Sequence, residues 1–172
     1  LFTPYGATES LPVSSISSAE VAEVGDQGQR EGRGVCVGRV TPGVAVVLIE
    51  VTDEPLPTWD QARVIEGVGP TAMGEVVVYG PSTTQGYLAR PDGDRASKIA
   101  GPPPGVEPLV GQEVSHRMGD MGYFDEEGRL WLCGRKSHRV SCEPTEHHPQ
   151  GFLSPLCVEG IMNTVAGVKR TA

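Results

Sequence analysis

The sequence predicts a mainly β, α+β fold, in which a small twisted antiparallel β-barrel subdomain is followed by the start of an α+β element. Three observations support this prediction. Short β-branched runs recur along the chain, as in V-A-V-V-L-I at residues 44–49. Gly and Pro together account for 38 of the 172 residues, which is typical of a turn-rich body. A helical pattern with an apolar face begins only near residue 155.

The first 34 residues are rich in Gly and Ser, and we expect them to form mostly loop, with one short helix at Ala19–Val24. Two β-branched runs follow at Val35–Val40 and Val44–Val51, separated by Thr41-Pro42-Gly43. Because Pro fixes φ and Gly tolerates positive φ, this tripeptide favours a turn. The two runs are therefore expected to pair as a hairpin.

The middle of the chain contains one isolated strand pattern. Residues 52–73 carry three prolines and predict a surface connection. Gly74–Gly80 (G-E-V-V-V-Y-G) predicts a strand that ends at Gly-Pro. A short helix is expected at Asp94–Ile99, with Asp94 as its cap.

A second hairpin is predicted from Met121 to Cys133. Met121–Phe124 and Arg129–Cys133 are strand patterns, and the turn D-E-E-G lies between them. Further on, Val140–Cys142 predicts a short strand. Pro155–Val165 predicts a helix with Pro in its first turn.

Composition excludes several classes of function. The net charge is −8, which disfavours binding to nucleic acid, and no apolar run approaches the ~20 residues that span a membrane. The four cysteines form no C-x-x-C pair, so we expect reduced thiols in a cytoplasmic protein. The spacing of Cys142, His147 and His148 is irregular and does not predict zinc. The chain starts at Leu1 without an initiator Met, and we expect a fragment of a longer protein.

The hexapeptide Tyr5–Ser10 (Y-G-A-T-E-S) is the first candidate functional segment. Gly6 lets the backbone approach a ligand closely, and the Thr8 hydroxyl is able to bond a phosphate oxygen. Glu9 offers a hard carboxylate suited to Mg²⁺ that also holds phosphate, and Tyr5 offers a flat face for a purine. The alternative is a Gly-containing turn followed by a helix cap.

Two further segments carry polar groups at the ends of the second hairpin. In H-R-M-G-D, Asp120 is suited to accept hydrogen bonds from the two hydroxyls of a ribose. In G-R-K-S-H-R-V, Arg135 directly follows a strand and is able to donate to ribose or phosphate. Taken singly, Asp120 is better explained as a turn residue, and Arg135 as a solvated strand end.

Together the three segments resemble the adenylate-forming (AMP-binding) superfamily, which includes acyl-CoA synthetases, peptide synthetase adenylation domains and luciferases. Y-G-A-T-E-S is similar to the family's Y-G-x-T-E motif. G-E-V-V-V-Y-G-P-S-T-T-Q-G-Y, residues 74–87, is similar to its G-E-I-x-x-x-G-x-x-x-x-x-G-Y segment. R-M-G-D-M-G-Y-F-D-E-E-G-R-L-W-L-C-G-R-K, residues 117–136, resembles R-T-G-D followed by D-x-x-G-x-L-x-x-x-G-R.

The resemblance implies an ATP-dependent ligase with ATP or AMP and Mg²⁺ as cofactors. Thr8 would bind the AMP phosphate and act with the Mg²⁺ ligand Glu9 in catalysis. Tyr5 would lie against the adenine, and Gly6 would belong to the nucleotide-binding residues. Asp120 would take the ribose hydroxyls, and Arg135 would contact ribose. Residues 1–135 would end the large AMP-binding domain, and residues 136–172 would form the hinge and the truncated start of the C-terminal domain. Ser137 would be the hinge, where many members have Asp or Lys.

Within the family, P-Y-G-A-T-E-S-L-P-V, H-R-M-G-D-M-G-Y and L-W-L-C-G-R-K-S-H-R-V look like olefin β-lactone synthetases. The implied substrate is a long-chain, β-hydroxy carboxylic acid whose own hydroxyl closes the lactone. The alternatives are a fatty acyl-CoA ligase using coenzyme A, an acyl-AMP ligase or peptide synthetase adenylation domain, and a non-catalytic nucleotide-binding interaction module. We expect the fragment to be inactive without the remainder of its enzyme, and its exposed surface makes an oligomer plausible.

Overall fold

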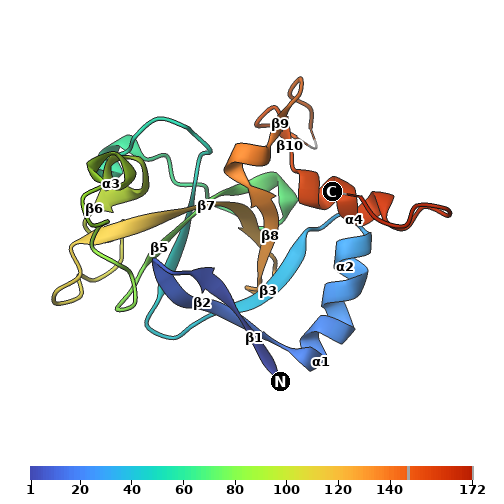
Figure 1. Cartoon of the computed structure of the whole chain (residues 1–172), viewed down its shortest axis with the longest axis horizontal. Helices are drawn as coiled ribbons and strands as arrows, with labels where there is room; N and C mark the ends of the chain where they lie inside the picture. The colour runs from blue at the N-terminus through green and yellow to red at the C-terminus, as the bar shows by residue number, and fades with distance from the viewer. Residues whose placement is uncertain (147, 172) are drawn as a thin grey trace.

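The computed structural model describes residues 1–146 and 148–171, which form a large antiparallel sheet, a two-stranded sheet and a few short helices (Figure 1). In the eight-stranded sheet the order is β1-β2-β3-β8-β7-β5-β4, and β6 pairs with β7. This architecture confirms the predicted mainly β, α+β fold class. The strands of this sheet are β1 (Phe2–Ala7), β2 (Ser10–Ser17), β3 (Val35–Val40), β4 (Ala45–Ile49), β5 (Gly74–Tyr79), β6 (Lys98–Ala100), β7 (Val114–Phe124) and β8 (Leu130–Arg135).

The first 17 residues form a hairpin, so the prediction that this region is mostly loop was wrong. β1 pairs with β2, and β2 continues into the sheet by pairing with β3. Val13 and Ile16 of β2 are buried, and the Ser14 hydroxyl donates to the Val37 carbonyl at 2.9 Å. The Ser-rich strand is stabilised by this distant partner, which a local pattern does not reveal.

A helical segment follows the hairpin and extends further than the predicted Ala19–Val24. It consists of α1 (Ser18–Glu20), a π-helical turn at Val21–Gly25 and α2 (Asp26–Arg30). Ser17 and Glu20 form a reciprocal capping box at its start. The segment packs on the sheet where Gly28 meets the Trp131 ring, because a Cβ at Gly28 would lie 2.2 Å from that ring.

The strands predicted on either side of Thr41-Pro42-Gly43 exist, but they do not pair with each other. β3 pairs with β2 and β8, while β4 pairs with β5. The tripeptide does make a turn, in which the Val44 N–H donates to the Thr41 carbonyl at 3.0 Å. Gly38 of β3 has a φ of +80°, and a Cβ there would lie 2.0 Å from the Ser15 carbonyl oxygen. The close approach of β3 to β2 outweighs the local hairpin signal.

The central strands agree with the sequence. β5 is buried along its whole length, and β7 pairs with β8 across the predicted turn, with Tyr123 opposite Trp131. Their rings are stacked at a centroid distance of 6.4 Å. The Trp131 indole donates to Asp125 at 2.8 Å, which links this turn to the main hydrophobic core.

The helix predicted at Asp94–Ile99 begins three residues earlier, so Asp94 is not its cap. α3 spans Pro91–Ser97. Asp94 lies inside this helix, where its carboxylate accepts from the Tyr87 N–H at 2.8 Å. Pro91 suits the first helical position because its missing N–H would be unpaired there. Short 3-10 turns lie at Trp59–Gln61 and Pro70–Ala72.

The C-terminal part contains a 3-10 turn at Lys136–His138, the paired strands β9 (Val140–Ser141) and β10 (Phe152–Leu153), and α4 (Pro155–Met162). The helix starts at Pro155 as predicted and ends three residues before Val165. α4 lies beside α2 (Figure 1), and a Cβ at Gly160 would lie 2.1 Å from the Gln29 carbonyl oxygen. No helix in the described part of the chain is both long and apolar enough to cross a bilayer.

Candidate functional site

Thr8 and Glu9 form the turn between β1 and β2, which excludes the alternative of a helix cap at this motif. The turn is held by the loop that follows β5. The Glu9 carbonyl accepts from the Thr84 N–H at 2.8 Å, and the Ser10 hydroxyl lies 3.3 Å from the Thr83 hydroxyl. The first motif is therefore positioned by a segment more than 70 residues away along the chain.

Gly6 serves the packing of its own hairpin. A Cβ at this position would lie 2.5 Å from the Ser10 carbonyl oxygen and 2.7 Å from the Leu11 side chain. The register of the β1–β2 pair shifts between Tyr5 and Ala7, on either side of Gly6. Glycine is therefore required at Gly6 because β1 approaches β2 closely at this point. The close approach of Gly6 to a ligand remains a prediction.

The Glu9 carboxylate is held by Tyr87, whose hydroxyl donates to Oε1 at 2.6 Å. This hydrogen bond is the main cause that lowers the pKa of Glu9. The Lys98 ammonium lies 5.6 Å from the centroid of the Tyr87 ring. Glu9 is therefore a fixed anion at neutral pH, and one such carboxylate with phosphate oxygens is a typical ligand set for Mg²⁺.

Asp120 and Arg135 lie directly opposite each other in the β7–β8 pair. Arg135 Nε is 3.1 Å from Asp120 Oδ1, and the Tyr5 hydroxyl donates to Oδ2 at 2.7 Å. Burial raises the pKa of Asp120, while its bonds to Tyr5 and Arg135 oppose that shift. The structure thus brings together three residues that the sequence placed in different motifs.

A cavity of about 320 Å³ connects the first motif to the third. Glu9 and Arg135 both line it, whereas Tyr5, Thr8 and Asp120 are not among its lining residues. Thr8 is exposed on the turn beside it. The wall of the cavity consists of Ala7, Glu9, Glu75, Tyr87, Ala96, Ser97, His116, Arg117, Met118, Gly119, Arg135 and Lys136.

A buried charge cluster that the sequence did not predict lies in this wall. Arg117 and Lys136 both donate to Glu75 Oε2, at 2.7 and 3.1 Å. Both cations also donate to the Thr52 carbonyl. Glu75 and Arg117 are almost completely buried, so the cluster fixes the strands that carry the cavity. The R-M-G-D and G-R-K motifs could have revealed this cluster in the sequence, because they contain Arg117 and Lys136.

His116 is a second residue that sequence reasoning missed. Its side chain is buried in the cavity wall, and burial lowers the pKa of the imidazole to about 4. Its Nδ1 has no hydrogen-bond partner within the described residues. The Tyr87 ring lies edge-on to it at 6.4 Å. His116 is therefore neutral at pH 7, and its Nδ1 is available for a hydrogen bond next to the Glu9–Tyr87 pair.

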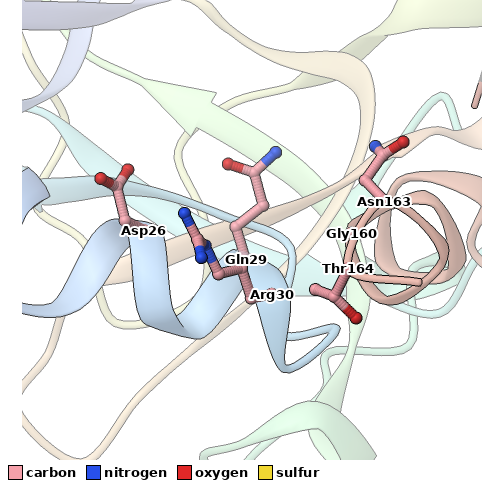
Figure 2. A pocket seen from close by; sticks show the side chains of 6 residues that line it. All are labelled: Asp26, Gln29, Arg30, Gly160, Asn163 and Thr164. Carbon is pink, nitrogen blue, oxygen red and sulfur yellow. The ribbon is translucent and has the colours of Figure 1, made fainter. Parts of the chain in front are cut away.

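A larger cavity of about 460 Å³ lies elsewhere, between α2 and the end of α4. Figure 2 shows Asp26, Gln29 and Arg30 projecting from α2, and Asn163 and Thr164 at the end of α4. None of the predicted site residues lines it. Its size therefore does not identify it as the site of the chemistry that the motifs imply.

Two other expectations from the sequence concern the hinge and the residues considered for zinc. Ser137 is exposed in the 3-10 turn directly after Arg135 and Lys136, so its hinge role remains a prediction. Of the residues considered for zinc, His147 lies outside the described residues. Across residues 1–146 and 148–171 no three His, Cys, Asp or Glu side chains gather as a metal site.

The antiparallel sheet, with its motifs at the β1–β2 turn and the β7–β8 pair, has the fold of adenylate-forming enzymes. An amide bond synthetase, McbA from Marinactinospora thermotolerans, matches with a TM-score of 0.65 and 23% identity, over 99% of this chain and 27% of that chain. O-succinylbenzoate coenzyme A synthetase from Bacillus subtilis, in complex with AMP, matches with a TM-score of 0.62 and 23% identity, over 98% of this chain and 27% of that one.

The chain is similar in sequence to relatives from the superfamily that its motifs indicated. It is 44% identical to an olefin β-lactone synthetase from Stenotrophomonas maltophilia over 173 residues, and 41% identical to one from Xanthomonas campestris pv. campestris over 172 residues. Each match covers 99% of this chain and 28% of the relative. The chain thus spans little more than a quarter of the length of these proteins. No family model matches it.

Proposed function

We propose that this chain is part of an ATP-dependent enzyme that activates a long-chain β-hydroxy acid as its acyl-adenylate and closes it to a β-lactone. The observation that carries the proposal is the 44% identity to an olefin β-lactone synthetase along nearly the whole chain. The fixed Glu9 anion and the Asp120–Arg135 pair beside a common cavity are consistent with half of a nucleotide site.

In the first step a substrate carboxylate oxygen attacks the α-phosphorus of ATP, and pyrophosphate leaves. We assign Thr8 to the phosphate, Asp120 to the ribose hydroxyls and Arg135 to the ribose. Tyr5 would lie against the adenine, and Gly6 would let the backbone approach the nucleotide closely. Glu9 would hold Mg²⁺, which supplies charge stabilisation to the phosphates when bound. The rigid supports of these groups favour catalysis by positioning.

In the second step the β-hydroxyl of the substrate attacks its own acyl carbonyl, its proton is released, and AMP leaves as the β-lactone closes. An acyl-CoA product, with coenzyme A as the attacking thiol, is the alternative within the superfamily. We place the boundary between the large and C-terminal domains after Arg135, with Ser137 as the hinge, and the enzyme in the cytoplasm, which the four free thiols favour.

Product analysis of the full-length enzyme that contains this chain tests the proposal. The enzyme is incubated with a β-hydroxy fatty acid, ATP and Mg²⁺, with and without coenzyme A. A β-lactone formed without coenzyme A is the expected result, and an acyl-CoA ester as sole product would identify a ligase instead. Absence of AMP binding by calorimetry would favour the non-catalytic module.

The assigned residues are tested by pyrophosphate exchange in the same enzyme. Glu9→Gln is expected to lower the exchange rate on the order of 100-fold, because a Mg²⁺ ligand is lost. Glu126→Gln, at an exposed residue of the β7–β8 turn, is the matched control and should retain the rate. We expect residues 1–172 alone to show only background exchange, and robust turnover by them would refute that expectation.

A further inference from the structure

Lys98 is a buried lysine without a carboxylate partner. It is the first residue of β6 and lies opposite His116 in the β6–β7 pair. The residue is only 8% exposed, and its Nζ makes no ion pair with any of the residues that the structure describes. Lysine is almost never buried unless it is paired, so the position of this ammonium group requires another explanation.

The ammonium group of Lys98 holds the loop that follows β5. Its Nζ donates to the Thr84 carbonyl at 2.6 Å and to the Thr84 hydroxyl at 3.0 Å. The N–H of the same threonine donates to the Glu9 carbonyl at 2.8 Å. Thr84 is itself exposed, so hydrogen bonds rather than packing fix its position. One threonine therefore links the buried ammonium to the backbone of the β1–β2 turn that carries Glu9.

A second path leads from Lys98 to the Glu9 side chain through Tyr87. The Lys98 Nζ lies 5.6 Å from the centroid of the Tyr87 ring, and the Tyr87 hydroxyl donates to Glu9 Oε1 at 2.6 Å. A cation at this distance is attracted to the face of the ring, and its field polarises the hydroxyl as a donor. The Tyr87 N–H is in turn held by Asp94 at 2.8 Å. Glu9 is thus supported at its backbone and at its carboxylate, and Lys98 contacts both supports.

We propose that Lys98 is a positioning residue that orients the Glu9 carboxylate towards a divalent cation, acting through Thr84 and Tyr87. Glu9 and Tyr87 line the cavity of about 320 Å³, whereas Lys98 is not among its lining residues. Lys98 therefore acts on the site through these two residues. The inference rests on the proposed function, because that function assigns Mg²⁺ to Glu9. The alternative is that Lys98 only stabilises the loop, and the two roles differ in their effect on the Mg²⁺ requirement.

The Mg²⁺ concentration that gives half-maximal pyrophosphate exchange in the full-length enzyme tests the proposal. Lys98→Met keeps an unbranched apolar side chain and removes the ammonium group. It should raise this concentration by about 10–100-fold, the usual effect of losing an outer partner of a metal ligand, and leave the KM of the fatty acid unchanged. Lys169→Met, at an exposed residue, is the matched control and should behave as the wild type. An unchanged Mg²⁺ requirement in Lys98→Met would overturn the proposal.

Two milder variants test the same paths and keep the proposal falsifiable even if Lys98→Met does not fold. Thr84→Val retains the carbonyl that Lys98 contacts and removes the hydroxyl. Tyr87→Phe retains the ring and removes the donor to Glu9. Each should raise the Mg²⁺ requirement in the same direction as Lys98→Met. If neither variant changed it, Lys98 would have no path to the carboxylate, and the proposal would be wrong.

Hydrogen exchange of the same full-length proteins supplies a readout that does not require activity. Peptides covering residues 80–87 should take up deuterium faster in Lys98→Met than in the wild type, because the loop loses the bonds that hold Thr84. Equal uptake would contradict the support described for Glu9. A wild-type enzyme without any pyrophosphate exchange would refute the proposed function, whereas deuterium uptake would still decide whether Lys98 fixes this loop.

Discussion

The Tyr5 hydroxyl donates a 2.7 Å hydrogen bond to Asp120, a residue 115 positions later in the chain. The sequence assigned the two residues to opposite parts of a nucleotide, with the Tyr5 ring at the adenine and Asp120 at the ribose. In the structure the edge of the phenol holds the carboxylate from one side, and Arg135 holds it from the other. Tyr5 is therefore placed to orient Asp120, whether or not its ring also contacts adenine.

Replacing Tyr5 with Phe should destabilise the fold by about 1.5–2 kcal/mol, the typical effect of losing a hydrogen bond to a charged group. It should also raise the pKa of Asp120 further, because the bond from Tyr5 lowers that pKa. Urea unfolding at pH 7 measures the stability change. Tyr123→Phe, which loses a bond to the neutral Arg33 carbonyl, is the control and should cost less. Equal losses in the two variants would argue against a special role for the Tyr5–Asp120 bond.

Glu75→Gln should destabilise the protein by about 3 kcal/mol, because Arg117 and Lys136 would lose the buried anion that both contact. Thermal and urea unfolding measure this change. The exposed Glu50–Arg63 pair provides a matched control. Glu50→Gln should alter stability by less than about 0.5 kcal/mol, and a loss at Glu75 no greater than that would contradict the importance of the cluster.

Two glycines in the helical segment 18–30 should respond in opposite ways to substitution by Ala. A Cβ at Gly28 would collide with the Trp131 ring at 2.2 Å, so Gly28→Ala should cost about 1–3 kcal/mol. A Cβ at Gly25 would make ordinary contacts with Val21 at 3.5 Å. Gly25→Ala should therefore stabilise by up to about 1 kcal/mol, the difference in helix propensity. Urea midpoints of the two variants decide the matter, and a stabilising Gly28→Ala would refute the packing described for Trp131.

Stability should fall between pH 6.5 and 4 in a way that depends on His116. The folded pKa of His116 is about 4, below its ordinary value of 6.5, so the unfolded state binds a proton more readily. The resulting stabilisation is fully present above pH 6.5 and is lost as the pH falls towards 4. It amounts to roughly 3 kcal/mol for a shift of this size.

His116→Gln should remove this part of the pH dependence, as judged from urea unfolding at pH 4, 5, 6 and 7. His138→Gln is the control, because His138 is exposed in the 3-10 turn after β8. The control should lose stability on acidification to the same extent as the wild type. If His116→Gln did so too, the buried neutral imidazole would not be the cause.

The strands with dense apolar character could be predicted from sequence because their patterns are local. Gly74–Tyr79 is buried along its whole length, and its own residues are enough to predict a strand. The Met121–Cys133 hairpin has a turn whose chemistry is contained in four residues, and Pro155 marks the first turn of α4. The motifs around Glu9, Asp120 and Arg135 likewise indicated the resemblance to the superfamily, because their residue types and order are properties of the sequence alone.

What the sequence by itself determined about this protein is its resemblance to the superfamily, its strand-rich character and the motifs that carry the resemblance. The tertiary structure decided which strands pair, since β2 joins β3 and leaves the apparent β3–β4 hairpin unpaired. It also decided the contacts of Tyr5 with Asp120 and of Glu9 with Tyr87. Each of these contacts joins residues far apart in the chain, and folding of the intervening segments sets their distances, so no local pattern encodes them.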